Sequence, residues 1–338
     1  AFISEQTHEK LKRSQIEKND ILFSMAGMFL GKTGIVTDDL VPANTNQAVA
    51  IIRIDTEKAN HEYVYYYLNQ RSVVQAVNAS SAQSAQPNIN LKQIGQIEID
   101  LPERKLQDKI VSILSAIDFK IEKNNQINEN LEQQAKAIYQ QMFIENTSPN
   151  WAEGSLRDIA DITMGQSPSG SSYNEDGIGT IFFQGRAEFS FRFPTIRLYT
   201  TEPKRMAYAN DILMSVRAPV GDLNIAHTDC CIGRGLAAIH SKTNHQSFVL
   251  YTMFSLRKQL DVFNGEGTVF GSINRNSLND MPILIPSDET IEEFEKIVAP
   301  MDAAIRNNYD EICRLQAVRD SLLPRLMSGE LDVSSVDI

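Results

Sequence analysis

Residues 106–142 have the sequence LQDKIVSILSAIDFKIEKNNQINENLEQQAKAIYQQM. Apolar or small residues recur in this stretch in steps of mostly three and four, which is the pattern of a heptad seam along one long helix. The seam positions are Leu106, Ile110, Ile113, Ile117, Ile121, Leu131, Ala135, Ile138 and Met142. Pro102 lies just ahead of them, where a helix can begin but cannot continue. The stretch therefore predicts one long helix with an interface along its length.

A second copy of this seam lies near the C-terminus, after Pro286. Its positions are Ile291, Phe294, Val298, Met301, Ile305, Asn308, Ile312, Leu315, Arg319 and Leu322. Alignment of the two seams matches Asn124 with Asn308, and a buried Asn in a seam usually fixes the register of a helix pair. We expect both Asn residues to lie between two paired helices. The alternative is two ordinary amphipathic helices on separate cores, but heptads sustained this long are uncommon in globular helices.

The stretches that precede the two helices also repeat. The matched segments are Asn19-Asp20-Ile21-Leu22 with Asn210-Asp211-Ile212-Leu213, Asn88-Ile89-Asn90 with Ser272-Ile273-Asn274, and Leu101-Pro102 with Ile285-Pro286. Such a long-period repeat determines the fold prediction. The chain is predicted to be two copies of one unit, each a mixed α/β domain followed by a long helix.

The repeat gives an α+β fold with four segments. We place a first mixed domain at 1–102, a central long helix at 103–147, a second mixed domain at 148–286, and a C-terminal long helix and tail at 287–338. The copies differ at their starts, because the first lacks the equivalent of Trp151 through roughly Ser190. Within the domains we expect a helix from Tyr63 through Val77, an extended alternating segment at 97–99, and a strand at 181–183.

Composition limits the functional classes. The chain has 338 residues and a net charge of −11, but residues 287–338 alone carry 12 acidic and 5 basic side chains. The two mixed domains are therefore near neutral and can present a basic face. No apolar run is long enough to span a bilayer. The three cysteines have neither disulfide nor metal-ligand spacing, and we expect a cytoplasmic protein.

No catalytic or metal-binding motif is complete. Gly27 to Thr33 resembles a phosphate-binding loop but has three residues between its glycines instead of four, and the residues after it are strand-like. A nuclease site could use Asp176, Glu202 and Lys204, but Pro203 disfavours the strand that such a site needs. No HExxH pair or GxSxG elbow occurs. We assign no catalytic residue and no metal ligand.

Arginine is the residue that favours a nucleic-acid function. Residues 148–286 contain nine Arg and three Lys, and Arg makes bidentate contacts to guanine and phosphate. Arg186, Arg217 and Arg234 lie in loops with glycines nearby, which allow a ligand to approach the backbone. The candidates for DNA contact are Lys32, Asn46, Gln83 and Asn88 in the first domain, and Gln166, Ser169, Tyr173, Gln184, Arg186, Arg217, Arg234, Thr268 and Asn274 in the second.

Three segments together resemble the specificity (S) subunit of type I restriction–modification enzymes. They are LPERKLQDKIVSILSAIDFKIEKNNQINENLEQQAKAIYQQMF, IPSDETIEEFEKIVAPMDAAIRNNYDEICRLQAVRDSLLPRLMSGELDV, and the run NDILMSVRAPVGDLNIAHTDCCIGRGLAAI between them. Each motif alone is moderately specific, but their order, repeated twice, is strongly specific. The resemblance covers essentially the whole chain.

The resemblance implies two target-recognition domains that each recognise one half of a split DNA sequence, with the two helices paired antiparallel as a spacer. At 1.5 Å per residue, helices of this length span roughly 50–60 Å, so the half-sites should be separated by a fixed gap. The resemblance also implies a non-catalytic chain that binds no cofactor. Its partners would be double-stranded DNA, two modification (M) subunits with S-adenosylmethionine, and restriction (R) subunits that use ATP and Mg, with no membrane involved.

Two other functional classes remain open from sequence. A self-contained DNA-cleaving or DNA-modifying enzyme would need a complete catalytic motif, and none is found. A coiled-coil interaction protein without nucleic acid would fit the net charge, but salt-sensitive DNA binding would exclude it.

Overall fold

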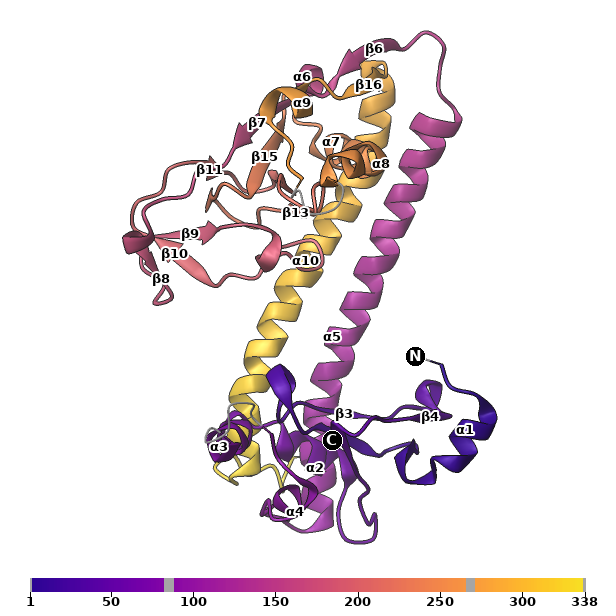
Figure 1. Cartoon of the computed structure of the whole chain (residues 1–338), viewed down its shortest axis with the longest axis vertical. Helices are drawn as coiled ribbons and strands as arrows, with labels where there is room; N and C mark the ends of the chain where they lie inside the picture. The colour runs from indigo at the N-terminus through magenta and orange to yellow at the C-terminus, as the bar shows by residue number, and fades with distance from the viewer. Residues whose placement is uncertain (1, 82–87, 266–270, 337–338) are drawn as a thin grey trace. The chain divides into compact units, whose positions relative to one another are not determined.

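Two long helices carry the repeat found in the sequence. In the computed structural model, which describes residues 2–81, 88–265 and 271–336, α5 spans Arg104–Tyr139 and α10 spans Asp288–Met327 (Figure 1). They contain 36 and 40 residues, and α5 continues into a π-helical turn at Gln140–Glu145. The chain divides into two units, residues 1–125 with 308–338, and residues 126–307, each described below by itself.

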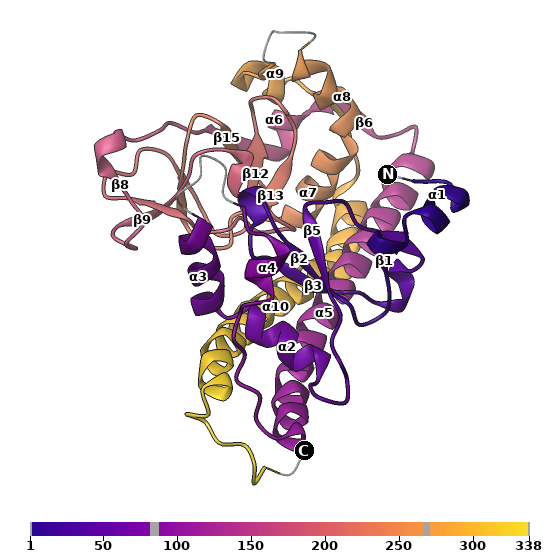
Figure 2. The same cartoon turned by 60° about the horizontal axis from the view of Figure 1, so that its bottom comes forward.

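Unit 1 contains a small antiparallel sheet with helices. Its elements are α1 (Glu5–Lys10), β1 (Gln15–Ile16), β2 (Ile21–Ser24), β3 (Thr33–Ile35), β4 (Ala43–Asn44), β5 (Val49–Ile52), α2 (His61–Leu68), α3 (Arg71–Ser81) and α4 (Leu91–Ile94), with parts of α5 and α10. The sheet order is β3-β2-β5, with β2 in the centre (Figure 2). Ile21 and Phe23 of β2 are buried against Val64 and Leu68 of α2 and Val77 of α3. The alternating pattern of β2 thus anchors the sheet to its helices.

The helix pair in unit 1 is antiparallel. Asp118 of α5 accepts a hydrogen bond from Arg319 at 2.8 Å, whereas Asn124, further along α5, donates to Glu311, earlier on α10, at 2.8 Å. Ile110 and Leu114 pack with Leu323 and Leu326 in the same core. This arrangement confirms the predicted pairing of the two helices.

The seam on α5 differs from the predicted one in two details. Leu114 is fully buried while Ile113 is only partly buried, so the seam steps from Ile110 to Leu114. The sequence predicted one buried Asn in the α5 seam, Asn124, but Asn124 and Asn128 are both buried, each 1% exposed. Asn308 on α10 is half-buried. That Asn124 and Asn308 set the register stays a prediction.

Unit 2 contains two larger sheets and a short strand pair. Its elements are β6 (Ala152–Ser155), α6 (Leu156–Ile159), β7 (Ala160–Met164), β8 (Tyr173–Asn174), β9 (Thr180–Phe183), β10 (Leu198–Thr200), β11 (Met206–Ala207), β12 (Ile212–Ser215), β13 (Leu223–Ile225), β14 (Cys230–Ile232), β15 (Leu236–Ser241), α7 (Gln246–Ser255), α8 (Arg257–Asp261), α9 (Arg275–Asn279) and β16 (Pro282–Ile285). The sheet orders are β13-β12-β15-β7, β11-β14-β9-β10-β8 and β16-β6, and only the β14–β9 pair is parallel among the described strands. The strand predicted at 181–183 is confirmed.

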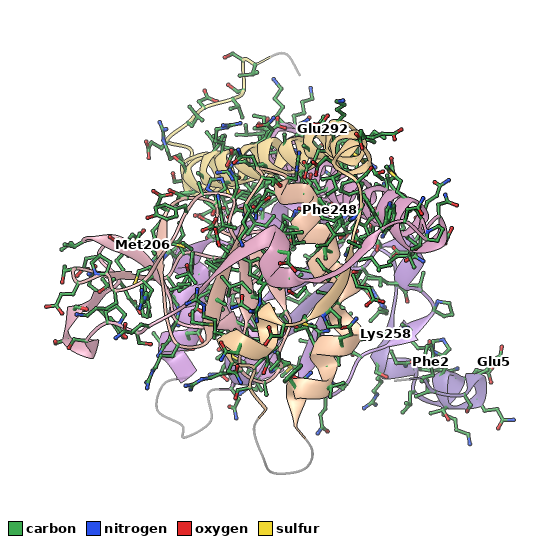
Figure 3. All side chains as sticks on the ribbon, turned by 90° about the horizontal axis from the view of Figure 1, so that it is seen from above. Phe2, Glu5, Met206, Phe248, Lys258 and Glu292 are labelled. Atoms are coloured by element: carbon green, nitrogen blue, oxygen red, sulfur yellow. The ribbon has the colours of Figure 1, made fainter. Side chains whose placement is uncertain are left out.

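An aromatic cluster holds both long helices in unit 2. Phe143, in the π-helical turn after α5, lies 5.1 Å from Phe248 of α7 and 5.2 Å from Phe294 of α10, measured between ring centroids. Phe248, labelled in Figure 3, is 2% exposed, and Phe294 is fully buried. Truncating such a buried ring to Ala typically costs about 3–5 kcal/mol. This cluster is therefore a principal source of stability where the helices meet the second domain.

The repeat is reproduced residue by residue in the two sheets. Ile21 pairs with Ile35 and Ile52, and Ile212 pairs in the same way with Ile225 and Ile239. Both copies place an Asn with positive φ just before the strand, Asn19 at 69° and Asn210 at 75°. An isolated bridge follows in each copy, Ala26 to Asn88 and Arg217 to Ser272. This correspondence makes Ala26 the counterpart of Arg217.

One sequence prediction in the first domain was wrong. The helix expected from Tyr63 through Val77 is broken between α2 and α3, because the Asn69 side chain donates to the Tyr65 carbonyl and to Thr33 instead of continuing the helix. The alternating residues 97–99 form no strand, whereas their counterpart in the second copy, β16, pairs with β6.

Candidate nucleic-acid interface

A hollow in unit 2 gathers four of the predicted contact residues. It has a volume of about 370 Å³, and Gln184, Arg186, Arg217 and Arg234 all line it. They come from three separate segments: the end of β9, the loop after β12, and the loop between β14 and β15. Ser167, Glu188, Arg197 and Ser215 line it as well. We call this site the arginine hollow.

Two glycines bring the segments of the hollow together. Gly233 and Gly235 flank Arg234, and their N–H groups donate to the carbonyls of Phe183 at 2.8 Å and Gln184 at 3.3 Å. A Cβ atom at Gly233 or Gly235 would lie 2.8 or 2.9 Å from the Gln184 carbonyl oxygen, closer than side-chain carbons approach. The glycines are therefore required because the chain after β9 crosses directly over them.

Arg217 is held at the rim of the hollow by backbone pairing. The Val216 N–H donates to the Gly235 carbonyl at 2.9 Å, and the Ile273 N–H donates to the Val216 carbonyl at 3.1 Å. Arg217 and Arg234 are exposed, and neither side chain has an ion-pair partner among the described residues. Their charges are therefore available to a ligand, and phosphate or a guanine edge are the DNA groups that arginine binds best.

Arg186 and Arg197 are arranged differently, because each faces a carboxylate. The Arg186 Nε lies 2.7 Å from Asp222, which also binds Arg257 at 2.6 Å. The Arg197 Nη2 donates to Glu188 at 2.8 Å, and this hydrogen bond raises the pKa of the Arg197 guanidinium. Sequence reasoning missed Glu188 and Arg197, since only the folded loop brings these two residues together.

The loop that carries Arg186, Glu188 and Arg197 is anchored at its middle. Arg192 is 6% exposed and binds Asp302 of α10 and the hydroxyl of Tyr251 on α7. Burial lowers the pKa of the Arg192 guanidinium, but the charge of Asp302 together with Tyr251 and Glu132 offsets this, and the pKa is raised overall. The buried Asn224 side chain binds the backbone of Ser190 twice: it accepts from the Ser190 N–H at 3.4 Å and donates to the Ser190 carbonyl at 2.7 Å. The loop is thus fixed to the helices before any ligand binds.

The other candidates in the second domain lie outside the residues that line the hollow. Tyr173 packs its ring 4.8 Å from Phe182 and donates its hydroxyl to the Pro168 carbonyl. Asn274 caps α9 by accepting from the Ser277 N–H at 2.9 Å. Gln166 and Ser169 are exposed. Thr268 lies outside the described residues.

The candidates in the first domain lie on three separate segments. Lys32 lies over the Phe29 ring at 4.8 Å, Asn46 accepts from the Ala48 N–H at 2.9 Å, and Asn88 forms the bridge to Ala26. Gln83 lies outside the described residues. Strand register makes Gln47 the counterpart of Arg234, just as Ala26 is the counterpart of Arg217. The first domain therefore has no copy of the arginine pair.

Within the described part of the chain, no cluster of three or more His, Cys, Asp or Glu side chains could hold a metal ion. Asp176 and Glu202, which a nuclease site would need, are both exposed. In the same residues, no helix has the length and apolar character needed to cross a membrane.

Comparison with known proteins gives the family. The model of the type I restriction modification DNA specificity domain matches residues 2–133 and 149–312, one stretch for each copy of the repeat. The chain belongs to this family. It is a DNA-recognition subunit of a type I restriction–modification system and not a catalytic one. A self-contained DNA-cleaving or DNA-modifying enzyme, the alternative left open by the sequence, is thereby set aside.

Individual relatives agree with this assignment. The chain is 28% identical over 357 aligned residues to a Methanocaldococcus jannaschii protein named as the MjaX specificity subunit of a type I restriction enzyme, covering 99% of this chain and 83% of the relative. It is 22% identical to the Haemophilus influenzae type I restriction enzyme HindI specificity subunit, over 94% of this chain and 88% of that one. A crystal structure of a type I S subunit from M. genitalium matches the fold with a TM-score of 0.56 and 16% identity, over 93% of this chain and 84% of that one.

Proposed function

We propose that the chain recognises a split DNA target, with one half-site for each mixed domain and a fixed, unrecognised gap between them. The two domains, at 1–102 and 148–286, repeat the same strand register but carry different side chains at equivalent positions, such as Ala26 and Arg217. Different side chains on one scaffold support two different half-sites. The uninterrupted helices α5 and α10 support a gap of constant length.

The arginine hollow is the observation that carries the proposal for the second half-site. Four residues selected from sequence alone come together there, and two of them, Arg217 and Arg234, have no ion-pair partner in the described chain. Gln184 would supply a side-chain amide suited to adenine, and the arginines suit guanine or phosphate. Gln166, Ser169, Tyr173, Thr268 and Asn274, and in the first domain Lys32, Asn46, Gln83 and Asn88, remain candidates for further contacts.

Family membership supports a proposal for the partners. We propose that the chain binds double-stranded DNA together with two modification subunits, and that restriction subunits join the full complex in the cytoplasm. S-adenosylmethionine would be bound by the modification subunits, and ATP and Mg by the restriction subunits, with no cofactor bound by this chain. Purified alone, the chain should neither methylate nor cleave DNA. Methyl transfer by the isolated chain would contradict this.

A domain exchange tests the split target. Residues 151–286 are replaced by the matching domain of a relative, and methylated adenines are mapped in cells that also carry the modification subunits. One half-site should change, while the other half-site and the gap should stay as they were. A change in both half-sites, or in the gap while α5 and α10 are unaltered, would rule out independent recognition by the two domains.

A further inference from the structure

The pair formed by Glu188 and Arg197 differs from the other charges in the hollow. The Glu188 side chain is 3% exposed, whereas the Arg197 side chain that it binds is 57% exposed. The carboxylate is therefore buried while the guanidinium is exposed, and both residues line the hollow. A buried carboxylate that accepts a hydrogen bond from an exposed arginine restricts the orientation of the guanidinium.

Glu188 is poorly explained as a stabilising residue. Its Oε2 atom is buried and has no hydrogen-bond partner among the described residues. A buried carboxylate oxygen without a partner opposes folding, and such groups in native proteins usually have a functional reason. Orienting Arg197 toward a ligand would be such a reason.

The loop around the pair is built to keep this geometry. Thr195 donates its N–H to the Glu188 carbonyl at 2.8 Å, which closes the loop between the two residues of the pair. Arg192, between them in sequence, is fixed to Asp302 on α10. The position of Arg197 is thus set by a long helix and not by a free surface loop, which favours recognition of a specific group.

We propose that Arg197 recognises one guanine in the half-site contacted by the second domain, and that Glu188 is its positioning residue. This inference rests on the proposed function of the domain. The pair has roughly no net charge, so it is a weak attractor for phosphate. An arginine with one of its five N–H donors held by Glu188 keeps the others in a fixed plane, which suits the O6 and N7 acceptors of guanine.

The test uses the full chain with its modification subunits in cells, and the readout is the sequence around each methylated adenine. Arg197→Lys keeps the charge but removes the planar fork. It should reduce the preference for guanine at a single position of one half-site on the order of 5- to 150-fold, the range of one bidentate contact. Glu188→Gln should relax the same position to a smaller extent. Arg205→Lys, an exposed arginine that does not line the hollow, is the matched control and should leave the target unchanged.

Binding measured at several salt concentrations separates base from phosphate contact. Arg197→Ala should keep its affinity for non-target DNA and its salt dependence. If Arg197→Ala instead weakens binding to all sequences alike and lowers the salt slope by about one, the contact is to phosphate and the proposal is wrong. It is also wrong if the target is unchanged in Arg197→Lys, or if both Arg197→Lys and Glu188→Gln fail to assemble, since the pair is then structural. Failure of the wild-type complex to methylate a split target would instead overturn the proposed function.

Discussion

Each unit has an aspartate at an equivalent position of a long helix, Asp118 in unit 1 and Asp302 in unit 2. The arginine that binds the aspartate differs between the two units. In unit 1, Asp118 of α5 accepts from the Tyr66 hydroxyl at 2.8 Å and from Arg319, which belongs to the partner helix α10. In unit 2, Asp302 of α10 accepts from the Tyr251 hydroxyl at 3.0 Å and from Arg192, which belongs to the globular domain. The tyrosine is retained in both copies, but the arginine comes from a different part of the chain.

The difference shows what each aspartate fastens. When Asp118 is aligned with Asp302, the residue that corresponds to Arg319 is Ala135 of α5. Ala135 is fully buried. At this position α5 has no cation for Asp302, and Arg192, from the loop that carries Glu188 and Arg197, supplies it. Asp118 ties one helix to the other, whereas Asp302 ties a helix to the loop proposed to contact DNA. Substitutions at these positions should therefore have different consequences in the two units.

The largest effect is expected from Asp302→Ala compared with Asp118→Ala. Arg192 would be left as a buried, unpaired charge, which typically costs about 3–5 kcal/mol. Arg319 is 30% exposed and keeps a second partner in Asp320, so loss of Asp118 should cost only about 1–2 kcal/mol, including the Tyr66 hydrogen bond. Urea unfolding of both variants measures the two costs.

Recognition of the two half-sites is a second measurement that compares Asp302 with Asp118. Asp302→Asn removes the charge but keeps an acceptor for Tyr251, and it should weaken recognition of the second half-site, because the loop loses its anchor. Asp118→Asn should leave both half-sites unchanged. Equal costs of unfolding for Asp302→Ala and Asp118→Ala would show that the loop anchor is no more important than the helix-to-helix contact.

The long helices and part of the arginine hollow could be predicted from local patterns. Heptad spacing predicted α5 and α10. The glycines beside Arg234 were expected to let a ligand approach the backbone, whereas the structure places the Gln184 carbonyl there. Glu188 and Arg197 could not be identified, because their pairing depends on a loop fixed by Arg192 and Asp302, which are far apart in sequence. The break at Asn69 was equally hidden, since its side-chain partner Thr33 lies on a different element.

The next effect in size concerns Gly233, whose counterpart by strand register in unit 1 is Asn46. In unit 1 this position carries a side chain, that of Asn46. Gly233→Ala should cost about 1–3 kcal/mol, since its Cβ would lie 2.8 Å from the Gln184 oxygen. It should also displace Arg186 and reduce recognition of the second half-site.

The control for this substitution is Gly34→Ala in β3, where an added Cβ meets nothing within 4 Å. Its effect should stay within about 0.5 kcal/mol. Thermal unfolding and methylation mapping measure both variants. A tolerated Gly233→Ala with an unchanged target would show that the segment after β9 can move without consequence for recognition.

The smallest effect concerns the interiors of the helix pair, which combine apolar residues with buried Asn in unit 1 and are aromatic in unit 2. Asn124 is 1% exposed and donates to Glu311, which also lies 3.3 Å from Lys120. Asn124→Leu adds apolar contact, and Glu311 keeps Lys120 as a partner. We therefore expect Asn124→Leu to raise stability by about 1 kcal/mol or less.

The pH dependence of this substitution has a definite sign. The hydrogen bond from Asn124, with the charge and hydrogen bond of Lys120, holds the pKa of Glu311 below its ordinary value. A lowered carboxyl pKa contributes stability above the unfolded pKa, and this contribution is lost as the pH falls through the folded pKa. Asn124→Leu should therefore lose less stability on acidification than the wild type. Unfolding measured from neutral pH down through the glutamate range tests this, and an unchanged acid dependence would show that the bond to Glu311 is weak in solution.

Replacing Asn124 and Asn308 together tests whether polar residues set the register of the helix pair. A buried Asn disfavours shifted pairings, because a shift would leave its amide without a partner. Leu at both positions removes that penalty, so the double variant should unfold at a higher temperature while the helices become able to slide. A sliding pair would separate the half-sites by more than one distance, and methylation mapping would then show a mixture of gap lengths. A single gap length, unchanged from the wild type, would mean that the register is set by the apolar contacts of Leu114 and Phe294 instead.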